Sequence, residues 1–460
     1  MKNYNGKPNY PKKEIYRSDY IDMSYKFDPL ALEQFNQIIP TDEIDSHMHV
    51  TASTRKGKSE FLKLMFIKYV PRYIPNKNCS VVLLDVHGDL SLQCIKMMKG
   101  LNVDLEDVVF IDLFLKKGYT PTINPFRIGK ANKETVSIVT QELISAFESI
   151  ISTDFTDNME VLLTPLIYIL LMKGDSGIDE LIRFLDDENY EDLLAYALTI
   201  QSKYHRDFIK NEFNKPKFKI TKEALSTKLR IFLCNTIFSS FVTGESTINL
   251  RKALNSGKII IFRFPKGKMR KVLAPVIKLI MALIQGIVFQ RADLPKDLRP
   301  KTYLICDEFQ NFFSQISDEI LSESGKNNLF ITMAHQYLTQ LDTKSRDGVL
   351  SGANIFVVGK NSDKELNAMA KQIEVDVSLL KNLKRGEFYV KVGSNNAIKI
   401  ETTDKYIDDK CSMSEIEWKR IKKYQKKRYY KKIDETIEDI SIASILDKTP
   451  SLPIPKFDEN

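Results

Sequence analysis

Two patterns of apolar residues alternate along this chain. Runs that are apolar throughout are typical of strands buried on both faces of a parallel sheet, whereas apolar residues spaced three and four positions apart are typical of helices. An α/β fold around a central, mostly parallel sheet is therefore expected. The expected strands are 46–51, 80–85, 107–112, 258–264, 302–306, 329–333 and 354–358, with a hairpin over 386–403.

One long stretch in the middle of the chain shows helical spacing only. The simplest account is an all-helical domain, 129–255, inserted between two parts of the sheet domain, 41–128 and 256–405. Residues 1–40 are expected to form an N-terminal arm. Residues 406–460 are expected to form a basic helical extension that ends in a flexible tail.

Composition narrows the class of protein. The 460 residues are 43% hydrophobic and carry a net charge of +8, which leans modestly towards anionic partners such as nucleic acid. Five cysteines without a C-x-x-C pair indicate neither a zinc site nor a disulfide framework and fit a reducing cytoplasm. The very apolar stretch 272–289 contains Pro275, Lys278 and Gln285, so a core helix is expected there rather than a membrane span.

The strand 46–51 leads into a candidate phosphate-binding loop. Gly57, Lys58 and Ser59 match the end of the pattern G-x-x-x-x-G-K-[ST], while Ala52 stands at its first glycine. Gly57 lets the backbone approach an anion, and the N–H groups that open the following helix point at phosphates. Lys58 supplies positive charge, and the Ser59 hydroxyl can reach Mg²⁺. Ala52 costs backbone freedom but no ligand, so binding is expected to survive it.

A second motif follows the strand 302–306. This strand delivers two consecutive carboxylates, Asp307 and Glu308. Asp307 is the candidate for the Mg²⁺ shell, and Glu308 is the candidate that polarises the attacking water in ATP hydrolysis. The alternative is an acidic pair at a strand end with no catalytic role. A further strand, 329–333, leads to Gln336, whose amide can sense a γ-phosphate.

Two other charged segments have a structural interpretation beside a functional one. Asp85, His87 and Asp89 form a turn after the strand 80–85. They could be metal ligands, but acids that cap the next helix are the favoured interpretation. The segment 418–432 interleaves nine Lys and Arg residues with aromatic residues, a pattern typical of nucleic-acid contacts and equally of a solvated helix face.

In their order and spacing, these motifs resemble the FtsK-HerA superfamily of DNA-pumping ATPases, especially its HerA-like and type IV secretion coupling-protein branches. The resemblance covers roughly residues 45–405. The matching segments are 47–59 for the P-loop strand and loop, 85–90 for a turn similar to D-P-H-G-D-L, 124–126 for an N-P-[LF] motif, 250–267, 307–310 and 334–341.

This resemblance implies a RecA-like P-loop NTPase fold, ATP and Mg²⁺ as cofactors, and a ring, commonly a hexamer, with DNA in its channel. At matching positions it implies Glu308, Lys58 and Gln336 as catalytic residues, and Ser59 and Asp307 as Mg²⁺ ligands. The implied nucleotide-binding residues are Ser53, Thr54, Arg55, Lys56, Gly57, Lys58, Ser59 and Glu60.

The departure from the family pattern that matters most concerns an arginine. Gly325 and Lys326 stand where members typically carry an Arg-Lys pair, whose arginine is thought to reach a neighbouring subunit's ATP. Because such an arginine contributes orders of magnitude to the rate, we expect slow or DNA-dependent hydrolysis. Lys326, Arg346 and Arg385 are the candidate substitutes.

The expected function is ATP-driven DNA translocation by a ring of identical subunits in conjugative or mobile-element DNA transfer. A cytoplasmic protein with no membrane span of its own, working with a membrane-bound or DNA-processing partner, fits this setting. Viral genome packaging and HerA-type DNA processing are alternatives within the family. An ATP-binding scaffold that does not hydrolyse ATP is the alternative from another class.

Overall fold

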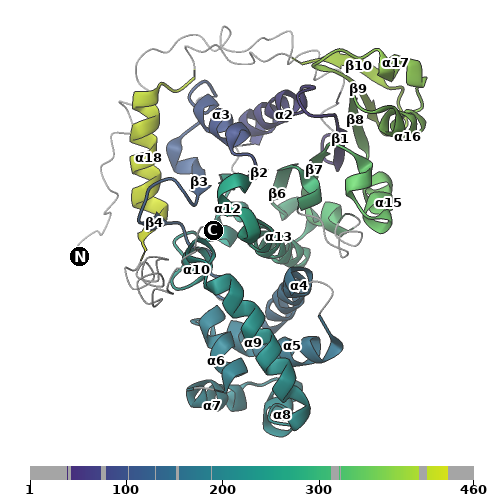
Figure 1. Ribbon diagram of the computed structural model, residues 1–460. Helices are drawn as coiled ribbons and strands as arrows, with labels where there is room; N and C mark the ends of the chain where they lie inside the picture. The colour runs from purple at the N-terminus through teal and green to yellow at the C-terminus, as the bar shows by residue number, and fades with distance from the viewer. Residues whose placement is uncertain are drawn as a thin grey trace, which may run out of the picture.

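We describe the fold from a computed structural model of the chain (Figure 1). It describes residues 39, 43–73, 79–101, 103–129, 131–151, 155–187, 189–311, 321, 323–402 and 412–433. The N-terminal arm expected over 1–40 lies outside these residues apart from Ile39, and the flexible tail expected at the end of the chain lies outside them beyond residue 433.

Nine of the strands in the described residues form one sheet, in the order β10-β9-β8-β1-β7-β6-β2-β5-β3. β9 and β10 are antiparallel to their neighbours, and the other strands are parallel. The prediction of an α/β fold with a mostly parallel sheet is confirmed. The strands are β1 (Met48–Thr51), β2 (Cys79–Asp85), β3 (Val108–Asp112), β4 (Tyr119–Thr120), β5 (Ile259–Arg263), β6 (Lys301–Asp307), β7 (Leu329–His335), β8 (Ile355–Gly359), β9 (Glu387–Val392), β10 (Ile398–Glu401) and β11 (Lys431–Lys432).

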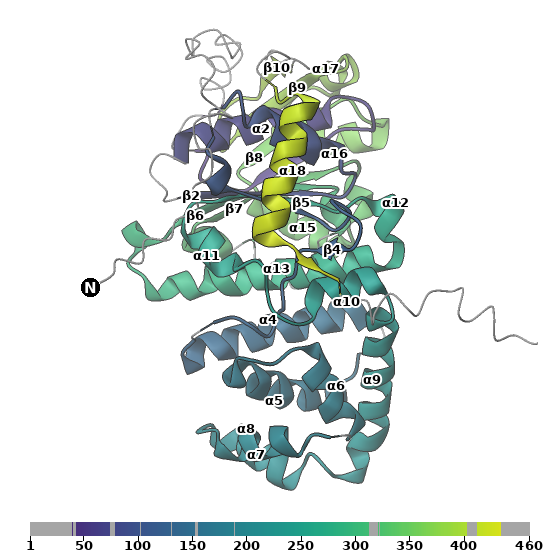
Figure 2. The same ribbon diagram turned by 90° about the vertical axis from the view of Figure 1, so that its left-hand side faces the viewer.

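Helices cover both faces of the sheet, and a helical lobe extends away from it (Figures 1 and 2). The helices are α2 (Lys58–Tyr73), α3 (Asp89–Met97), α4 (Lys133–Ile151), α5 (Asp157–Lys173), α6 (Ile178–Asp186), α7 (Glu191–Thr199), α8 (Lys203–Asn211), α9 (Lys219–Leu233), α10 (Thr236–Val242), α11 (Leu250–Asn255), α12 (Lys266–Met269), α13 (Leu273–Phe289), α15 (Thr343–Gly352), α16 (Asp363–Ile373), α17 (Val377–Lys381) and α18 (Glu415–Tyr429). α2 and α3 lie on one face, α13 and α4 lie on the other, and α5 to α9 form the lobe.

The central strands are apolar throughout because both of their faces are buried. In β2, Val81 and Leu83 belong to the core that includes α2 and α3, whereas Val82 and Leu84 belong to the core that includes α4 and α13. Successive side chains of a strand point to opposite faces. One strand thus serves two cores, and no polar position is left to break the run.

The very apolar helix α13 is part of a core. The helical stretch from Lys266 to Asp293 is long and apolar enough to cross a membrane, but most of it is buried in the protein. Within it, Gly286 faces α4, where a Cβ on this glycine would lie 3.3 Å from Val139 Cγ2. Close packing of two helices explains this stretch without a membrane.

The parallel order brings the carboxyl ends of β1, β6 and β7 to one edge of the sheet. Thr51 of β1 is in register with His335 of β7, and Asp307 of β6 is in register with Ala334 of β7. The loops that follow these strands are therefore neighbours, at the edge where α/β proteins bind ligands.

Helix α18 covers the edge strand β3 with the inner face of the basic segment 418–432 (Figure 1). The Gln425 amide is buried, donates to the Val108 carbonyl and accepts from Phe110 N–H, both at 3.0 Å. Trp418 is buried edge-on against the Phe110 ring. An open edge strand has unpaired backbone groups, so side chains of α18 take the place of another strand.

Tyr430 continues this edge contact beyond the end of α18. Its buried hydroxyl accepts from Asp112 N–H and donates to the Phe110 carbonyl, both at 2.9 Å. Lys419 and Lys423 lie on the exposed side of the same segment. Trp418 and Tyr430 are thus occupied in the fold and are not available to stack on nucleic-acid bases, while the lysines face solvent.

Candidate active site

The loop from Ala52 to Gly57 joins β1 to α2 and has the close backbone approach that a phosphate loop needs. Gly57 has a φ of +106°, and a Cβ on it would lie 2.9 Å from Gly386 Cα. Conformation and space both require glycine there. Ala52 is fully buried, does not have a positive φ, and packs closely enough that a Cβ on Gly359 would lie 2.9 Å from its Cβ. The alanine therefore suits the loop without strain.

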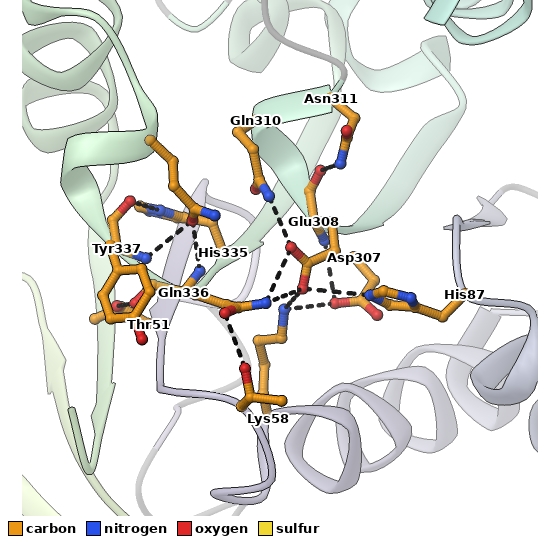
Figure 3. Close-up of polar contacts among 12 residues, drawn as sticks. Thr51, Lys58, His87, Asp307, Glu308, Gln310, Asn311, His335, Gln336 and Tyr337 are labelled. Carbon is orange, nitrogen blue, oxygen red and sulfur yellow. Dashed lines mark hydrogen bonds and ion pairs between the residues drawn. The ribbon is translucent and has the colours of Figure 1, made fainter. Parts of the chain in front are cut away.

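Lys58 begins α2 and lies between the two acids that end β6 (Figure 3). Its Nζ is 2.9 Å from Asp307 Oδ1 and also contacts Glu308 Oε1, and each of the three side chains is at most 10% exposed. Burial disfavours the charge on Lys58, but the two carboxylates outweigh burial and raise its pKa. The site is thus built on a buried cluster of one cation and two acids.

The two acids of this cluster lie in different electrostatic surroundings. Burial raises the pKa of Asp307, and Lys58 only partly offsets that effect. Burial also acts on Glu308, but hydrogen bonding to His87 and the charge of Lys58 hold its pKa well below the usual range. Glu308 is therefore the acid that the surroundings keep charged.

Glu308 also has an unusual backbone. Its φ of +58° is in the left-handed region, which costs a non-glycine residue about 1–3 kcal/mol and is found preferentially at functional sites. Gln310 Nε2 donates to Glu308 Oε2 at 2.7 Å, and Asn311 Nδ2 donates to the Glu308 carbonyl at 2.8 Å (Figure 3). These bonds hold the carboxylate at the centre of the site.

The turn after β2 adds His87 to the site. His87 Nε2 lies 3.6 Å from Glu308 Oε1, and hydrogen bonding to Glu308 raises the pKa of this half-exposed histidine. Asp85 accepts from His87 N–H and Gly88 N–H at 2.9 Å, and from Ser91 N–H at 2.7 Å. Its oxygens thus cap α3, as the structural interpretation predicted.

No cluster of three or more His, Cys, Asp or Glu residues placed to hold a metal ion occurs within the part of the chain that the structure describes. The contacts of Asp85 with backbone N–H groups favour the capping interpretation of this turn over a metal site at Asp85, His87 and Asp89. His87 instead faces Glu308, the acid that directly follows the neighbouring strand β6.

Gln336, just after β7, points its amide into the same space (Figure 3). Its Nε2 lies 3.3 Å from Glu308 Oε1, and its Oε1 accepts from Thr54 Oγ1 at 2.9 Å. A single side chain therefore touches the phosphate loop and the acidic pair. The structure brings together Lys58, Asp307, Glu308, Gln336 and Thr54.

The remaining residues assigned to the nucleotide lie along the loop and the first turn of α2. Ser53 Oγ donates to Asn361, the Lys56 carbonyl accepts from Gly386 N–H, and Glu60 forms an ion pair with Lys63. Arg55 and Ser59 are exposed.

These residues fit a Mg²⁺-nucleotide. The N–H groups of the first turn of α2 have no partners within the helix and open onto the loop. The exposed Ser59 follows directly after Lys58, whose Nζ contacts the Asp307 carboxylate. Mg²⁺ usually takes one or two protein oxygens and completes its shell with water and phosphate. Ser59 and Asp307 are suitable for that role.

The candidate substitutes for the absent arginine lie apart. Lys326 is exposed in a short turn, where its Nζ lies 2.7 Å from Glu323, and Arg346 is partly buried beside Asp347. Arg385 is exposed next to Gly386, whose N–H donates to the Lys56 carbonyl at 3.0 Å. Among the described residues, Arg385 is thus the candidate whose neighbour in sequence contacts the phosphate loop.

No family model and no curated protein sequence matches this chain. Solved structures do match it. Unbound bacterial conjugative coupling protein TrwB aligns over 80% of this chain and 87% of its own, at a TM-score of 0.56 and 16% identity. The chain has the fold of a conjugative coupling protein. Plasmid coupling protein TrwB in complex with ADP and Mg²⁺, and with a non-hydrolysable ATP analogue, aligns over 82% of this chain and 90% of its own, each at a TM-score of 0.56 and 17% identity.

The likeness to TrwB confirms, at the level of the fold, the resemblance that the motifs suggested. It extends over most of both chains at low identity. The P-loop fold with its mostly parallel sheet is thereby established.

Sequence reasoning missed two neighbours of the site. The first is the contact of His87 with Glu308, which two adjacent parallel strands produce at their carboxyl ends. The second is Asn361, after β8, which reaches both Ser53 and Gln336. No motif marked Asn361, because its position beside the phosphate loop depends on the pairing of β8 with β1, a strand far away in the sequence.

Proposed function

We propose that this protein is a Mg²⁺-dependent ATPase that drives DNA translocation in conjugative or mobile-element transfer. The observation that carries the proposal is the buried contact of Lys58 with Asp307 and Glu308. This contact joins the phosphate loop after β1 to the acidic pair at the end of β6, on either side of β7. The TrwB-like fold supports the coupling-protein setting, and the complexes of TrwB with ADP and Mg²⁺ and with an ATP analogue support these cofactors.

The residues of the site can share the work of hydrolysis. Residues 53–60 bind the phosphates, and Lys58 moves its charge from the acids to the phosphate chain. Glu308 then loses its nearest cation, its pKa rises, and it becomes a better acceptor for a proton from water. Ser59 and Asp307 would hold Mg²⁺, which would supply positive charge to neutralise the phosphates.

Gln336 is placed to sense this change. Its Nε2 donates to the Glu308 carboxylate and its Oε1 accepts from Thr54. An amide can donate and accept at once, so a γ-phosphate in this space would compete with Glu308 for Nε2. Movement of Gln336 then reports the triphosphate to the loop after β7.

The DNA partner and the ring are further parts of the proposal. A hexameric ring of identical subunits places DNA in its channel, and the net charge of +8 favours an anionic partner. Residues 41–128 and 256–405 form the ATPase domain and 129–255 the inserted helical domain. A cytoplasmic protein recruited by a membrane-bound or DNA-processing partner fits the core position of α13.

A second candidate function is an ATP-binding scaffold that does not hydrolyse ATP. It is favoured by Gly325 and Lys326 at the position of the family's arginine, since Lys326 is paired with Glu323 on the surface. Packaging and HerA-type DNA-processing motors share the mechanism and differ in setting, so they predict the same enzyme kinetics.

Steady-state ATPase assays with and without DNA test the proposal. We expect Mg²⁺-dependent turnover that DNA stimulates, and loss of turnover in Lys58→Ala and Glu308→Gln. Lys423→Ala, on the exposed side of α18, is the matched control and should keep basal wild-type turnover. Tight ATP binding without turnover, with or without DNA, would establish the scaffold instead.

A further inference from the structure

Asn361 lies just after β8, where its amide bridges two loops of the site. Its Oδ1 accepts from Ser53 Oγ at 2.7 Å and from Ser362 N–H at 2.9 Å. Its Nδ2 donates to the Gln336 carbonyl at 2.7 Å and to Thr51 Oγ1 at 3.1 Å. Ser362 N–H can only donate and the Gln336 carbonyl can only accept, so the orientation of the amide is fixed by chemistry.

The Ser53 end of this bridge is anchored twice. Besides the side-chain bond, Ser53 N–H donates to the Lys360 carbonyl at 3.0 Å. Ser53 begins the loop that closes with Gly57 and Lys58. A shift of the loop on phosphate binding therefore pulls on residues 360 and 361 directly.

The Gln336 end is held through its backbone, which leaves its side chain to reach Glu308 and Thr54. Thr51 Oγ1 also donates to the Gln336 carbonyl at 3.2 Å. The buried Glu365 carboxylate accepts from Leu338 N–H at 3.0 Å. The loop after β7 is thus fixed at the Gln336 carbonyl and at Leu338 N–H. Asn361, which binds the Gln336 carbonyl, also binds Ser53 of the phosphate loop.

We propose that Asn361 is a positioning residue that couples the phosphate loop to Gln336, so that occupation of the γ-phosphate position and the placement of Gln336 change together. This inference rests on the proposed function, because it assigns Asn361 to the same nucleotide site. Its amide is required for both connections at once. A side chain that can only accept hydrogen bonds would keep the bond from Ser53 but lose the bond to the Gln336 carbonyl.

The decisive variant is Asn361→Asp, which has nearly the same shape. It keeps an acceptor for Ser53 and Ser362 but places a carboxylate oxygen against the Gln336 carbonyl. We expect ATP turnover to fall about 10- to 100-fold, since small misplacements of catalytic groups cost that much, while the affinity for ADP stays within a factor of about three. Asn396→Asp is the control for the added charge. It lies exposed between β9 and β10, at the amino end of β8 and away from the site.

A double-mutant cycle separates coupling from simple support of the fold. If Asn361 acts through Gln336, Asn361→Asp has little further effect on turnover in a Gln336→Ala background, because interacting residues are not additive. If Asn361→Asp lowers turnover by the same factor in the Gln336→Ala background as in the wild-type protein, the proposal is overturned. Melting temperatures of the single and double variants check that all of them are folded.

A binding measurement tests the same inference without turnover. Fluorescence competition with ADP and a non-hydrolysable ATP analogue gives the preference of each variant for the triphosphate. We expect Asn361→Asp and Gln336→Ala to lose the same preference, by about tenfold. If the wild-type protein prefers the triphosphate but does not hydrolyse ATP, the proposed function fails, and the binding measurement still tests the role of Asn361. If Asn361→Asp keeps the wild-type preference for the triphosphate, the role of Asn361 is overturned and the proposed function is unaffected.

Discussion

The carboxyl edge of the sheet and helix α18 are both rich in charge, but the fold treats their charges in opposite ways. At the edge, Lys58, Asp307 and Glu308 are buried and in mutual contact. On α18, Lys419 and Lys423 face solvent, and the buried residues are Trp418, Ile421 and Gln425. The first arrangement is costly to bury and therefore indicates function, whereas the second stabilises the edge of a sheet.

This contrast shows which sequence signals are specific. A run of lysines and aromatic residues fits a nucleic-acid contact or a solvated helix, and the structure uses its aromatic members for packing. The combination of Gly57 and Lys58 in a phosphate loop with two acids after a buried strand has fewer explanations, because the fold brings Lys58 into contact with both acids. Burial and pairing, rather than charge density, separate the two regions.

The largest difference between the regions should appear in a lysine-to-alanine comparison. Lys58→Ala leaves two buried carboxylates without their cation, so we expect a loss of about 3 kcal/mol or more in unfolding free energy and loss of ATP binding. Lys423→Ala should change stability by less than about 0.5 kcal/mol. Chemical denaturation and nucleotide titration of both variants measure this. Equal stability of the two variants would mean that the buried cluster around Lys58 does not depend on its cation.

The inner face of α18 should matter more than its outer face. Gln425→Ala leaves Val108 carbonyl and Phe110 N–H without partners in a buried position, so we expect a loss of roughly 1–3 kcal/mol. Thermal unfolding and hydrogen exchange at β3 are the readouts. Gln372→Ala is a control, because its amide makes one longer bond of 3.4 Å to the Leu350 carbonyl. A stable variant with protected β3 amides would show that α18 does not close the sheet edge.

Acid should destabilise the core through its buried histidines. Burial lowers the pKa of His47 and of His335 to about 4 from 6.5, so between those values the unfolded chain binds the protons. Their contribution is present above pH 6.5 and is lost as pH falls towards 4, which amounts to roughly 2 kcal/mol for each histidine at pH 5. His87, whose pKa is raised by Glu308, acts in the opposite direction and loses its contribution as pH rises.

Unfolding free energies in denaturant between pH 5 and pH 8 measure this balance. We expect stability to fall clearly on acidification, because the buried histidines outweigh the half-exposed His87. A stability that does not change over this range would mean that His47 and His335 are not buried in the neutral form.

The smallest effect on stability is expected on the exposed side of α18. Lys419→Glu with Lys423→Glu should leave the melting temperature nearly unchanged, since exposed substitutions usually stay within about 0.5 kcal/mol. DNA affinity measured over a salt series decides whether this face contacts phosphates. A lower affinity with a shallower salt slope assigns it to DNA, and an unchanged slope leaves α18 as a cover for β3.

The fold and the main site residues could be predicted from sequence because local signals carried them. Continuous apolar runs predicted the buried strands, and the residues after β1, β6 and β7 predicted which side chains meet at the carboxyl edge of the sheet. Contacts between distant segments could not be predicted in this way. The neighbours of Glu308 and Gln336 include His87 and Asn361, and both contacts depend on which strands lie side by side.

The turnover of Glu308→Gln, measured beside its ATP affinity, most directly tests whether Lys58, Asp307 and Glu308 form an ATP-hydrolysing site. Glutamine keeps the size of the side chain and removes its ability to accept a proton. We expect ATP binding within a few-fold of wild type and a loss of turnover on the order of 100-fold or more. Wild-type turnover in Glu308→Gln would contradict the assignment of Glu308 as the base and, with it, the proposed ATP-hydrolysing site at the carboxyl edge of the sheet.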